Sequence, residues 1–297
     1  MSACSREPAS QISKKTTTKN NRGEYIVLFQ YIKKLIAVAA IVVLQFSISG
    51  TALAQPRDPE LDRTIPAPRL NDGKIDFGGD GVWSLPWITN FAVRIVGGDE
   101  NSSVPFLPWT KAMHEYNASN NVAYDPEGFC LPPGGPRSMG TPYPAEIIQH
   151  RDRIIIIFEG GGHVWREIHM DDRQHPDKET LNPSYFGHSV GHWENDTLVV
   201  DTVGFNEKTW LDFGGHMHSD QLHTIEYITR PDKNTLHYEA TIDDPGAYTE
   251  PWTVAWDINW SEGQELADYI CQENNKFMID LIDDFGNPFF ESTTVAR

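Results

Sequence analysis

Thiols, positive charge and common catalytic motifs are all scarce in this sequence of 297 residues, which has three cysteines and 24 Lys or Arg against 42 Asp or Glu. No C-x-x-C pair indicates dithiol redox chemistry. H-E-x-x-H, a phosphate-binding loop and the G-x-G-x-x-G dinucleotide fingerprint are also absent. Gly187-His188-Ser189-Val190-Gly191 has the letters G-x-S-x-G, but the parallel strand and helix of a nucleophile elbow do not surround it. The sequence therefore favours none of these enzyme classes.

A targeting signal is predicted at the N-terminus. Lys33 and Lys34 precede an apolar run over residues 35–48, and Ala52-Leu53-Ala54 has the A-x-A pattern of a cleavage site. The run is short for a bilayer span. We expect residues 1–54 to be a signal peptide with a long n-region, and the protein to be exported to the periplasm or secreted. An uncleaved membrane anchor is the alternative.

Removal of this segment leaves a strongly acidic chain. Residues 1–54 hold 7 of the basic and 2 of the acidic residues, so the remaining 243 residues have 17 basic and 40 acidic side chains and a formal charge of −23. Phosphate backbones and anionic lipids repel such a chain. We expect a small-molecule ligand or substrate, no nucleic acid partner, and no stable membrane insertion after cleavage.

Cys130 and Cys271 are the two cysteines that remain after cleavage. An even pair in an oxidising compartment predicts a disulfide. It would close a loop of about 140 residues, which in the chain-entropy model contributes on the order of 4 to 5 kcal/mol. Two separate buried thiols are the alternative.

Two segments of the remaining chain predict irregular structure. Residues 55–80 are rich in Pro, Asp, Gly and Arg without periodicity, so we expect an extended lead-in. Residues 125–144 are dense in Pro and Gly, which predicts a long connection without regular structure. A loop of this kind often covers or gates a site.

One helix is predicted over residues 108–119. Trp109, Ala112, Met113 and Tyr116 recur at helical spacing, which predicts an amphipathic helix with these side chains on its apolar face. His114 lies off that face. We expect the apolar face to pack on the core.

A period of two dominates after residue 145 and predicts a series of β-strands. Turn-forming residues lie between most of them, so neighbouring strands are expected to be antiparallel. The predicted strands cover residues 153–159, 164–170, 188–193, 197–203, 222–229, 235–242 and 252–260. We expect an all-β fold, with residues 81–297 as a single domain in which an antiparallel meander closes into a β-barrel; a sandwich is the alternative.

Histidine is concentrated in this β region, where eight of the eleven histidines lie between His163 and His223. Imidazole is a metal ligand when neutral and exchanges a proton near neutral pH, so the region is where we expect chemistry. His150, His175 and His237 lie next to turns or on polar strand faces and are expected to be structural.

The histidines support two hypotheses. His216 and His218 form an H-x-H pair on one side of an extended chain and, with His223, could bind Zn, Fe, Mn or Cu, with His188 or Glu226 completing the ligand shell. Alternatively, His188, His218, His223 and Glu226 act as general acids and bases without a metal. The pattern leaves both hypotheses open.

A row of aromatic residues on the last predicted strand indicates a candidate ligand-binding surface. Trp252, Trp256 and Trp260 lie on one face of the last predicted strand. Such a stripe is more often core, but in a wide barrel it can line a cavity. Trp252, Trp256 and Tyr227 are therefore the expected ligand-binding residues.

Two resemblances follow from these motifs. The stretch GHSVGHWENDTLVVDTVGFN at residues 187–206, with TIDDPGAY at 241–248 and PWT at 251–253, resembles a widespread family of exported bacterial proteins of uncharacterised function. The resemblance implies export and a β-rich fold. Gly81-Val82-Trp83 is similar to the G-x-W that begins the first strand of lipocalin-type barrels, and this likeness implies a calycin-like β-barrel. A helix and a long loop after it depart from that pattern.

The sequence favours an exported enzyme that acts by acid/base chemistry, as an isomerase, lyase or hydrolase, on a small and partly apolar molecule in a barrel cavity. Metal assistance is an open possibility. A non-catalytic periplasmic carrier of a hydrophobic or aromatic ligand is one alternative. A metal-binding protein without catalysis is another.

Overall fold

The computed structural model describes residues 61–98, 103–273 and 275. The predicted signal peptide, its cleavage site and Cys4 lie outside the described residues. Within the described part of the chain, no helix has the length and apolar composition needed to cross a membrane.

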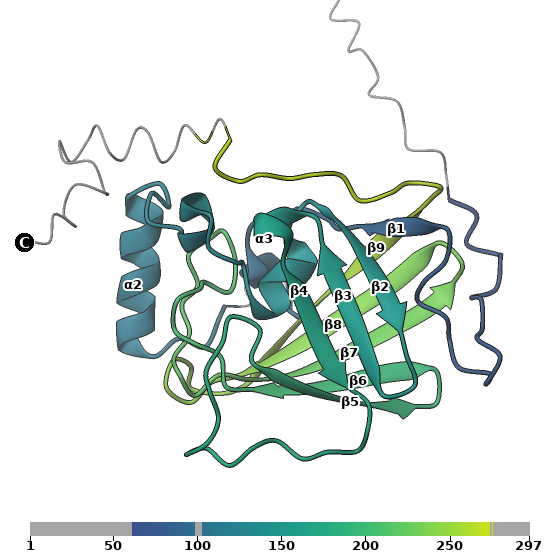
Figure 1. Ribbon diagram of the computed structural model, residues 1–297. Coiled ribbons are helices and arrows are strands. Elements are labelled where there is room, and N and C mark those ends of the chain that lie inside the picture. Colours follow the sequence, from purple (N-terminus) through teal and green to yellow (C-terminus); the bar gives the residue numbers. More distant parts are fainter. Residues whose placement is uncertain (1–60, 99–102, 274, 276–297) are drawn as a thin grey trace, which may run out of the picture. The chain divides into compact units, whose positions relative to one another are not determined.

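Nine strands form a closed barrel in sequence order, and β1 pairs with β9 to complete the closure (Figure 1). This arrangement confirms the prediction of an all-β barrel. The strands are β1 (Gly81–Ser84), β2 (Pro144–Gln149), β3 (Arg153–Phe158), β4 (Trp165–His169), β5 (His188–Glu194), β6 (Thr197–Val203), β7 (His223–Asp232), β8 (Thr235–Asp243) and β9 (Trp252–Glu262).

Each of the seven predicted strands is present, with ends that differ from the prediction by at most three residues. The prediction missed β2, which begins at the last residue of the Pro/Gly-rich segment. It also took all pairings as antiparallel, whereas β4 and β5 are parallel, with Ile168 opposite Ser189. A parallel pair needs a long crossover, and residues 170–187 supply one.

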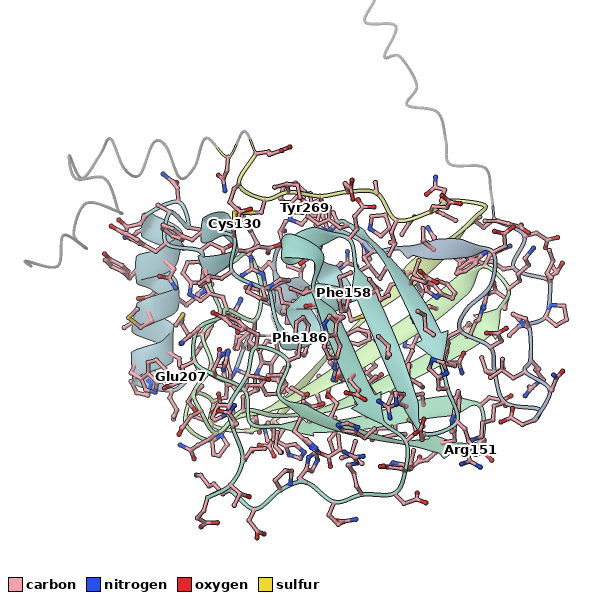
Figure 2. All side chains as sticks on the ribbon, viewed as in Figure 1. Cys130, Arg151, Phe158, Phe186, Glu207 and Tyr269 are labelled. Atoms are coloured by element: carbon pink, nitrogen blue, oxygen red, sulfur yellow. A yellow bond between two sulfur atoms is a disulfide. The ribbon has the colours of Figure 1, made fainter. Side chains whose placement is uncertain are left out.

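Strand alternation sends every second side chain into the barrel, where each of the nine strands contributes buried residues. Figure 2 shows side chains on both faces of the strands. These side chains form one continuous core. The inward residues include Trp83, Ile147, Ile154, Ile156, Arg166, Ile168, Ser189, Val200, Thr202, Thr224, Glu226, Ile228, Tyr238, Ala240, Trp252, Val254, Trp256, Ile258 and Trp260.

Segments outside the strands cover the barrel. The lead-in buries Ile75 and Phe77, and Arg230 donates to the carbonyls of Asp76 and Gly78. The Pro/Gly-rich segment is not wholly irregular, because it contains two short 3-10 helices, η2 (Pro126–Phe129) and η3 (Gly135–Gly140). Pro and Gly permit the tight turns of such helices although they exclude long regular elements. The remaining short helices are η1 (Phe91–Arg94) and α3 (Gly160–His163).

Helix α2 (Pro108–Ser119) has the predicted bounds, but the prediction of its buried face was wrong. Trp109, Met113 and Tyr116 are exposed, whereas Thr110 and Asn117 are buried. The buried pair is polar because its side chains donate to backbone carbonyls of the neighbouring loops, Thr110 to Ala247 and Asn117 to Gly215. Hydrogen bonds to loop backbone thus outweighed the apolar periodicity.

Cys130 and Cys271 form the predicted disulfide, with a Cα–Cα distance of 5.6 Å and 141 residues between them. It joins the segment after η2 to the chain that follows β9. The disulfide therefore links the connection between β1 and β2 to the chain after β9.

Candidate functional site

Four strands contribute outward side chains to a cluster of histidines and aspartates on the barrel's outer face. His169 ends β4, His188 begins β5, Asp201 lies on β6, and His223 begins β7. The 170–187 connection adds His175. Its other end packs on the barrel, where Phe186 stacks on Phe158 of β3 with ring centroids 5.9 Å apart (Figure 2). The crossover required by the parallel strands thus brings His175 over the neighbouring strands.

Hydrogen bonds connect the cluster into a chain. His188 Nδ1 lies 2.8 Å from His175 Nδ1, and His175 Nε2 lies 3.1 Å from Asp201 Oδ1. His223 Nε2 lies 2.9 Å from the same Asp201 oxygen. We call these four residues, His175, His188, Asp201 and His223, the histidine relay.

The acceptor character of a carboxylate determines the tautomers in the histidine relay. Asp201 only accepts, so His175 and His223 each donate through Nε2–H. A neutral His175 then has a lone pair at Nδ1, and His188 donates to it through Nδ1–H. The lone pair of neutral His188 is therefore at Nε2. Within the described residues that atom has no hydrogen-bond partner, and it is not among the buried polar atoms left unpaired, so it is open to solvent.

The surroundings of His188 favour its neutral form. Burial lowers the pKa of His188, and the positive charge that His175, His169 and Arg173 can carry lowers it further. Near neutral pH the His188 imidazole is therefore available as a base.

A second polar cluster lies inside the barrel. Arg166 pairs with Glu226 through both terminal nitrogens, and it also donates to Ser189 and Thr202 at 3.1 and 2.9 Å. The Tyr238 hydroxyl donates to Glu226 Oε1 at 2.6 Å. We call these five residues the interior network.

The interior network is buried, and hydrogen bonds connect all of its side chains. The exposed fractions of the Arg166 and Glu226 side chains are 1% and 0%. Burial opposes the charge of Arg166, but Glu226 outweighs it and raises the pKa of the guanidinium. Burial and then Glu226 raise the pKa of Tyr238 well above its ordinary value. Glu226 is therefore held as the counter-ion of Arg166, out of reach of solvent and of the predicted histidine partners.

His216 belongs to a third, separate group. Its Nδ1 lies 2.7 Å from Asp212 Oδ2, and its ring stacks on His114 with centroids 4.3 Å apart and on Phe106 at 5.4 Å. Burial opposes the charge of Asp212, but the hydrogen bond from His216 outweighs it and lowers the pKa of the carboxyl. Burial and then His216 lower the pKa of His114.

His218 is buried and partnered on both ring nitrogens. Nδ1 donates to the Ser219 carbonyl at 3.0 Å, and Nε2 lies 2.9 Å from the Thr209 hydroxyl. Burial lowers the pKa of His218. His218 is 2% exposed, and its two contacts connect the loop segments that contain Thr209 and Ser219.

The structure does not bring His216, His218 and His223 together as metal ligands, because each imidazole bonds to a different partner. In residues 61–98, 103–273 and 275, no group of three or more His, Cys, Asp or Glu side chains is arranged to hold a metal ion. The cause is the position of the 216–218 segment, which lies in a buried loop rather than on a strand beside His223.

The predicted ligand-binding aromatics also lie apart. Trp252 and Trp256 point inward and are each 5% exposed, and Phe91 packs on both of them. Tyr227 lies on the opposite, outer face of β7. Trp252 and Trp256 therefore belong to the core, and the three side chains do not share a surface.

Sequence reasoning placed His188 and His223 in one site, and the structure places both in the histidine relay. It missed Asp201, and it assigned His175 a structural role. Period-two alternation could have shown that Asp201 shares the outward face of β6 and that Arg166 points inward toward Glu226. No sequence pattern could have placed His175, because it lies in a connection without strand periodicity.

No protein-family model, curated protein or solved structure matches the chain. The site consists of a hydrogen-bonded histidine–aspartate relay on the outer face of a nine-stranded closed barrel.

Proposed function

We propose that this protein is an exported hydrolytic enzyme that works by general acid/base catalysis, with His188 as the base. The observation that supports the proposal is the hydrogen-bond chain from His188 through His175 to Asp201. That chain leaves His188 Nε2 unprotonated and open to solvent. Catalytic histidines are commonly oriented in this way by a second group and a carboxylate.

Each proton in the proposed step has a destination. His188 Nε2 takes a proton from an attacking water as the water oxygen bonds to the electrophilic carbon of the substrate. The Nδ1 proton of His188 passes to Nδ1 of His175, which becomes an imidazolium beside Asp201. Return of the proton through His188 Nε2 to the leaving group restores the relay. Asp201 is the positioning residue that stabilises the transient positive charge.

The wet position of the relay favours hydrolysis over isomerisation or elimination. The exposed fractions of the His175, His223 and Asp201 side chains are 23%, 33% and 42%. Water therefore reaches the base, whereas an isomerase gains from excluding it. The substrate would be a small, partly apolar ester or amide that binds on the outer face.

The disulfide supports export. Cys130 and Cys271 are bonded, which suits an oxidising compartment such as the periplasm or the medium. N-terminal sequencing of the protein purified from its native host should begin at Gln55. An N-terminus at or before residue 33 would contradict the proposed signal peptide.

A test of the proposed activity compares His188→Ala with the wild type in hydrolysis of p-nitrophenyl acetate. A positioned general base contributes on the order of 10²-fold or more, so we expect kcat/KM to fall by about 100-fold. Because the pKa of His188 is lowered, the wild-type rate should rise with pH to a plateau, with a midpoint below about 6.5, the ordinary histidine value.

The matched control is His237→Ala. His237 forms a similar surface pair, with Nδ1 2.8 Å from Asp257 Oδ1, but it has no second imidazole. Its loss should change kcat/KM by less than about twofold. Equal losses in both variants, or wild-type activity in His188→Ala, would contradict the proposal.

A further inference from the structure

A cavity of about 580 Å³ lies outside the barrel strands. Its lining residues come from loops and short helices: the segment after β1, the chain from the end of α2 through η2, η3 and the residues after it, the β6–β7 connection, and the chain around Cys271. Volumes of this size accommodate small organic molecules. The cavity shares no residue with the histidine relay, so it is an independent site.

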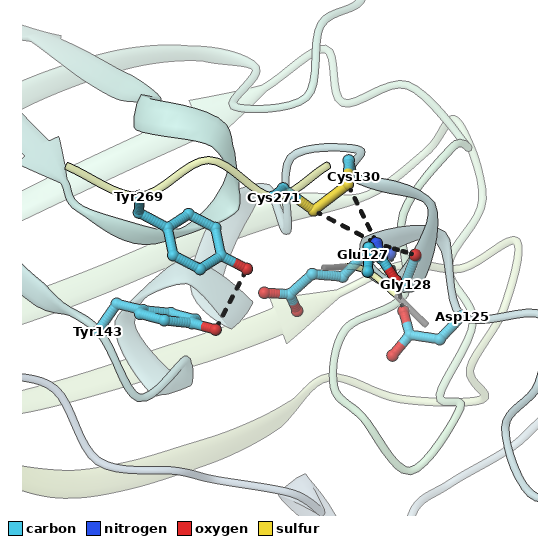
Figure 3. Close-up of a disulfide and its surroundings, with 8 residues drawn as sticks. Asp125, Glu127, Gly128, Cys130, Tyr143, Tyr269 and Cys271 are labelled. Carbon is cyan, nitrogen blue, oxygen red and sulfur yellow. Dashed lines mark hydrogen bonds between the residues drawn. A yellow bond between two sulfur atoms is a disulfide. The ribbon is translucent and has the colours of Figure 1, made fainter. Parts of the chain in front are cut away.

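Aromatic side chains form much of its wall. Trp87 and Phe213 are 63% and 40% exposed and meet edge to face, with ring centroids 5.9 Å apart. Tyr143 and Tyr269 face each other at 4.6 Å, with their hydroxyl oxygens 3.2 Å apart (Figure 3). Exposed aromatic rings around a cavity are typical of a site for an apolar or cationic body.

The charged lining residues are unbalanced. Asp125, Glu127 and Glu273 contribute three carboxyl groups against one guanidinium, that of Arg137. Asp125 binds Arg137 through two parallel hydrogen bonds of 2.9 and 2.6 Å, and these two side chains are each 5% exposed. Glu127 adds a second carboxylate, 2.8 Å from the same guanidinium. Arg137 is therefore already neutralised, and it cannot serve as an anion-binding group.

Glu127 is the acidic group that remains available to a ligand. Its side chain is 22% exposed, compared with 5% for Asp125. Its Oε2 lies 2.8 Å from Arg137 Nη2, and Oε1 has no hydrogen-bond partner in the part of the chain that the structure describes. Burial raises the pKa of Glu127, and the opposing effect of Arg137 is smaller. A nearby positive charge would stabilise its ionised form.

We propose that this cavity binds an organic cation, a primary amine on a ring-sized apolar body, with the ammonium at Glu127 and the ring against Trp87 and Phe213. The proposal combines the aromatic wall with the excess of carboxylates. It also agrees with the pairing of Arg137 to two carboxylates, because a guanidinium that is already neutralised cannot attract a carboxylate ligand.

The test uses three probes of matched size on the full chain with its disulfide intact: 2-phenylethylamine, 2-phenylethanol and phenylacetate. Equilibrium dialysis and tryptophan fluorescence measure binding. The amine should bind at least about tenfold more tightly than the neutral alcohol, since one carboxylate–ammonium contact is of that size. Phenylacetate should bind more weakly than both, and added salt should reduce only the amine affinity.

Two variants test whether Glu127 and Trp87 contact the bound amine. Glu127→Gln keeps the shape and the hydrogen bond to Arg137, and it should weaken amine binding about tenfold while leaving the alcohol unchanged. Trp87→Ala removes a largely exposed ring and should weaken both. Glu179→Gln, an exposed residue of the 170–187 connection, is the matched control and should have no effect.

Equal affinity for the amine and phenylacetate, full affinity in Glu127→Gln, or no amine binding at millimolar concentration would each overturn the proposal. The result is separable from the proposed hydrolysis, because His188→Ala should bind the amine as the wild type does.

Discussion

The interior network and the histidine relay lie on opposite faces of three shared strands, β5, β6 and β7. On β5 and β6 their members are adjacent in sequence: His188 precedes Ser189, and Asp201 precedes Thr202. The inward member of each pair bonds to Arg166, whereas the outward member bonds to His175. Residues that are adjacent on a strand thus belong to different environments, one beside a buried ion pair and the other among partly exposed imidazoles.

The difference between the two clusters shows that the environment of a polar group determines its role. In the interior network the carboxylate is bound by a guanidinium and a phenol, so it has no capacity left for proton transfer. In the histidine relay the contact between His175 and His188 can reverse its donor and acceptor when a proton arrives, because each imidazole can donate or accept. We therefore expect the interior network to determine stability and the histidine relay to determine activity.

The largest expected effect is on folding, in Glu226→Ala. Removing one partner leaves the Arg166 charge buried without its counter-ion, which typically costs about 3–5 kcal/mol. The free energy of unfolding, from urea titration, should fall by that amount. The double variant Arg166→Met with Glu226→Leu should be more stable than Glu226→Ala. If the single variant lost less than about 1 kcal/mol, the comparison between the two clusters would fail.

A smaller effect, on activity, is expected in Asp201→Asn. The amide keeps the shape but not the charge that stabilises the His175 imidazolium, so ester hydrolysis should slow by about 10- to 100-fold. Because Asp201 is 42% exposed, the free energy of unfolding should change by less than about 1 kcal/mol. Asp257→Asn, which alters the His237 pair, is the control and should leave hydrolysis unchanged. A large loss of stability with normal activity would assign Asp201 to structure instead.

The smallest expected effect is a loss of stability in mild acid. The folded-state pKa of His188 is lowered by burial, so the unfolded chain binds the proton more readily, and its histidine titrates near 6.5. Stability is therefore complete above that pH and declines as the pH falls through the lowered pKa. His114 and His218, whose pKa values are also lowered by burial, act in the same direction.

Urea titrations at pH 7.5 and 5.5 measure this effect. The difference in unfolding free energy between the two pH values should be smaller in His188→Gln than in the wild type. His237→Gln is the control for a histidine outside the relay. A wild-type protein that became more stable at pH 5.5 would contradict the sign of this prediction.

The strands were predictable because their signal is local. From β3 to β9 the alternation of apolar and polar residues is strong, and the turns between them are rich in Asp, Asn and Pro. The same alternation explains the observed faces: His188, Val190 and His192 share the outward face of β5, and Arg166 shares the inward face of β4 with Ile168. Period-two reasoning succeeds here because strand geometry assigns the face of each side chain.

The functional site was predictable only in part. His188 and His223 lie 35 residues apart in sequence, and the register of β5 and β7 on β6 brings them to either side of Asp201. His216 and His218 had a metal-site pattern, but the loop that contains them turns inward. The face of α2 was mispredicted for a similar reason, because Thr110 and Asn117 bond to distant loop carbonyls.

The amino-acid sequence by itself determined the strands, the helix bounds, the acidic charge and the cysteine pair, since each depends on local spacing or on composition. Tertiary structure decided which polar groups are partners. Arg166 meets Glu226, and His175 meets His188, through contacts between residues 60 and 13 positions apart. Such contacts follow from strand register and from the path of one crossover. Local periodicity specifies neither, because the free energy of a long-range pair depends on where the rest of the chain has packed.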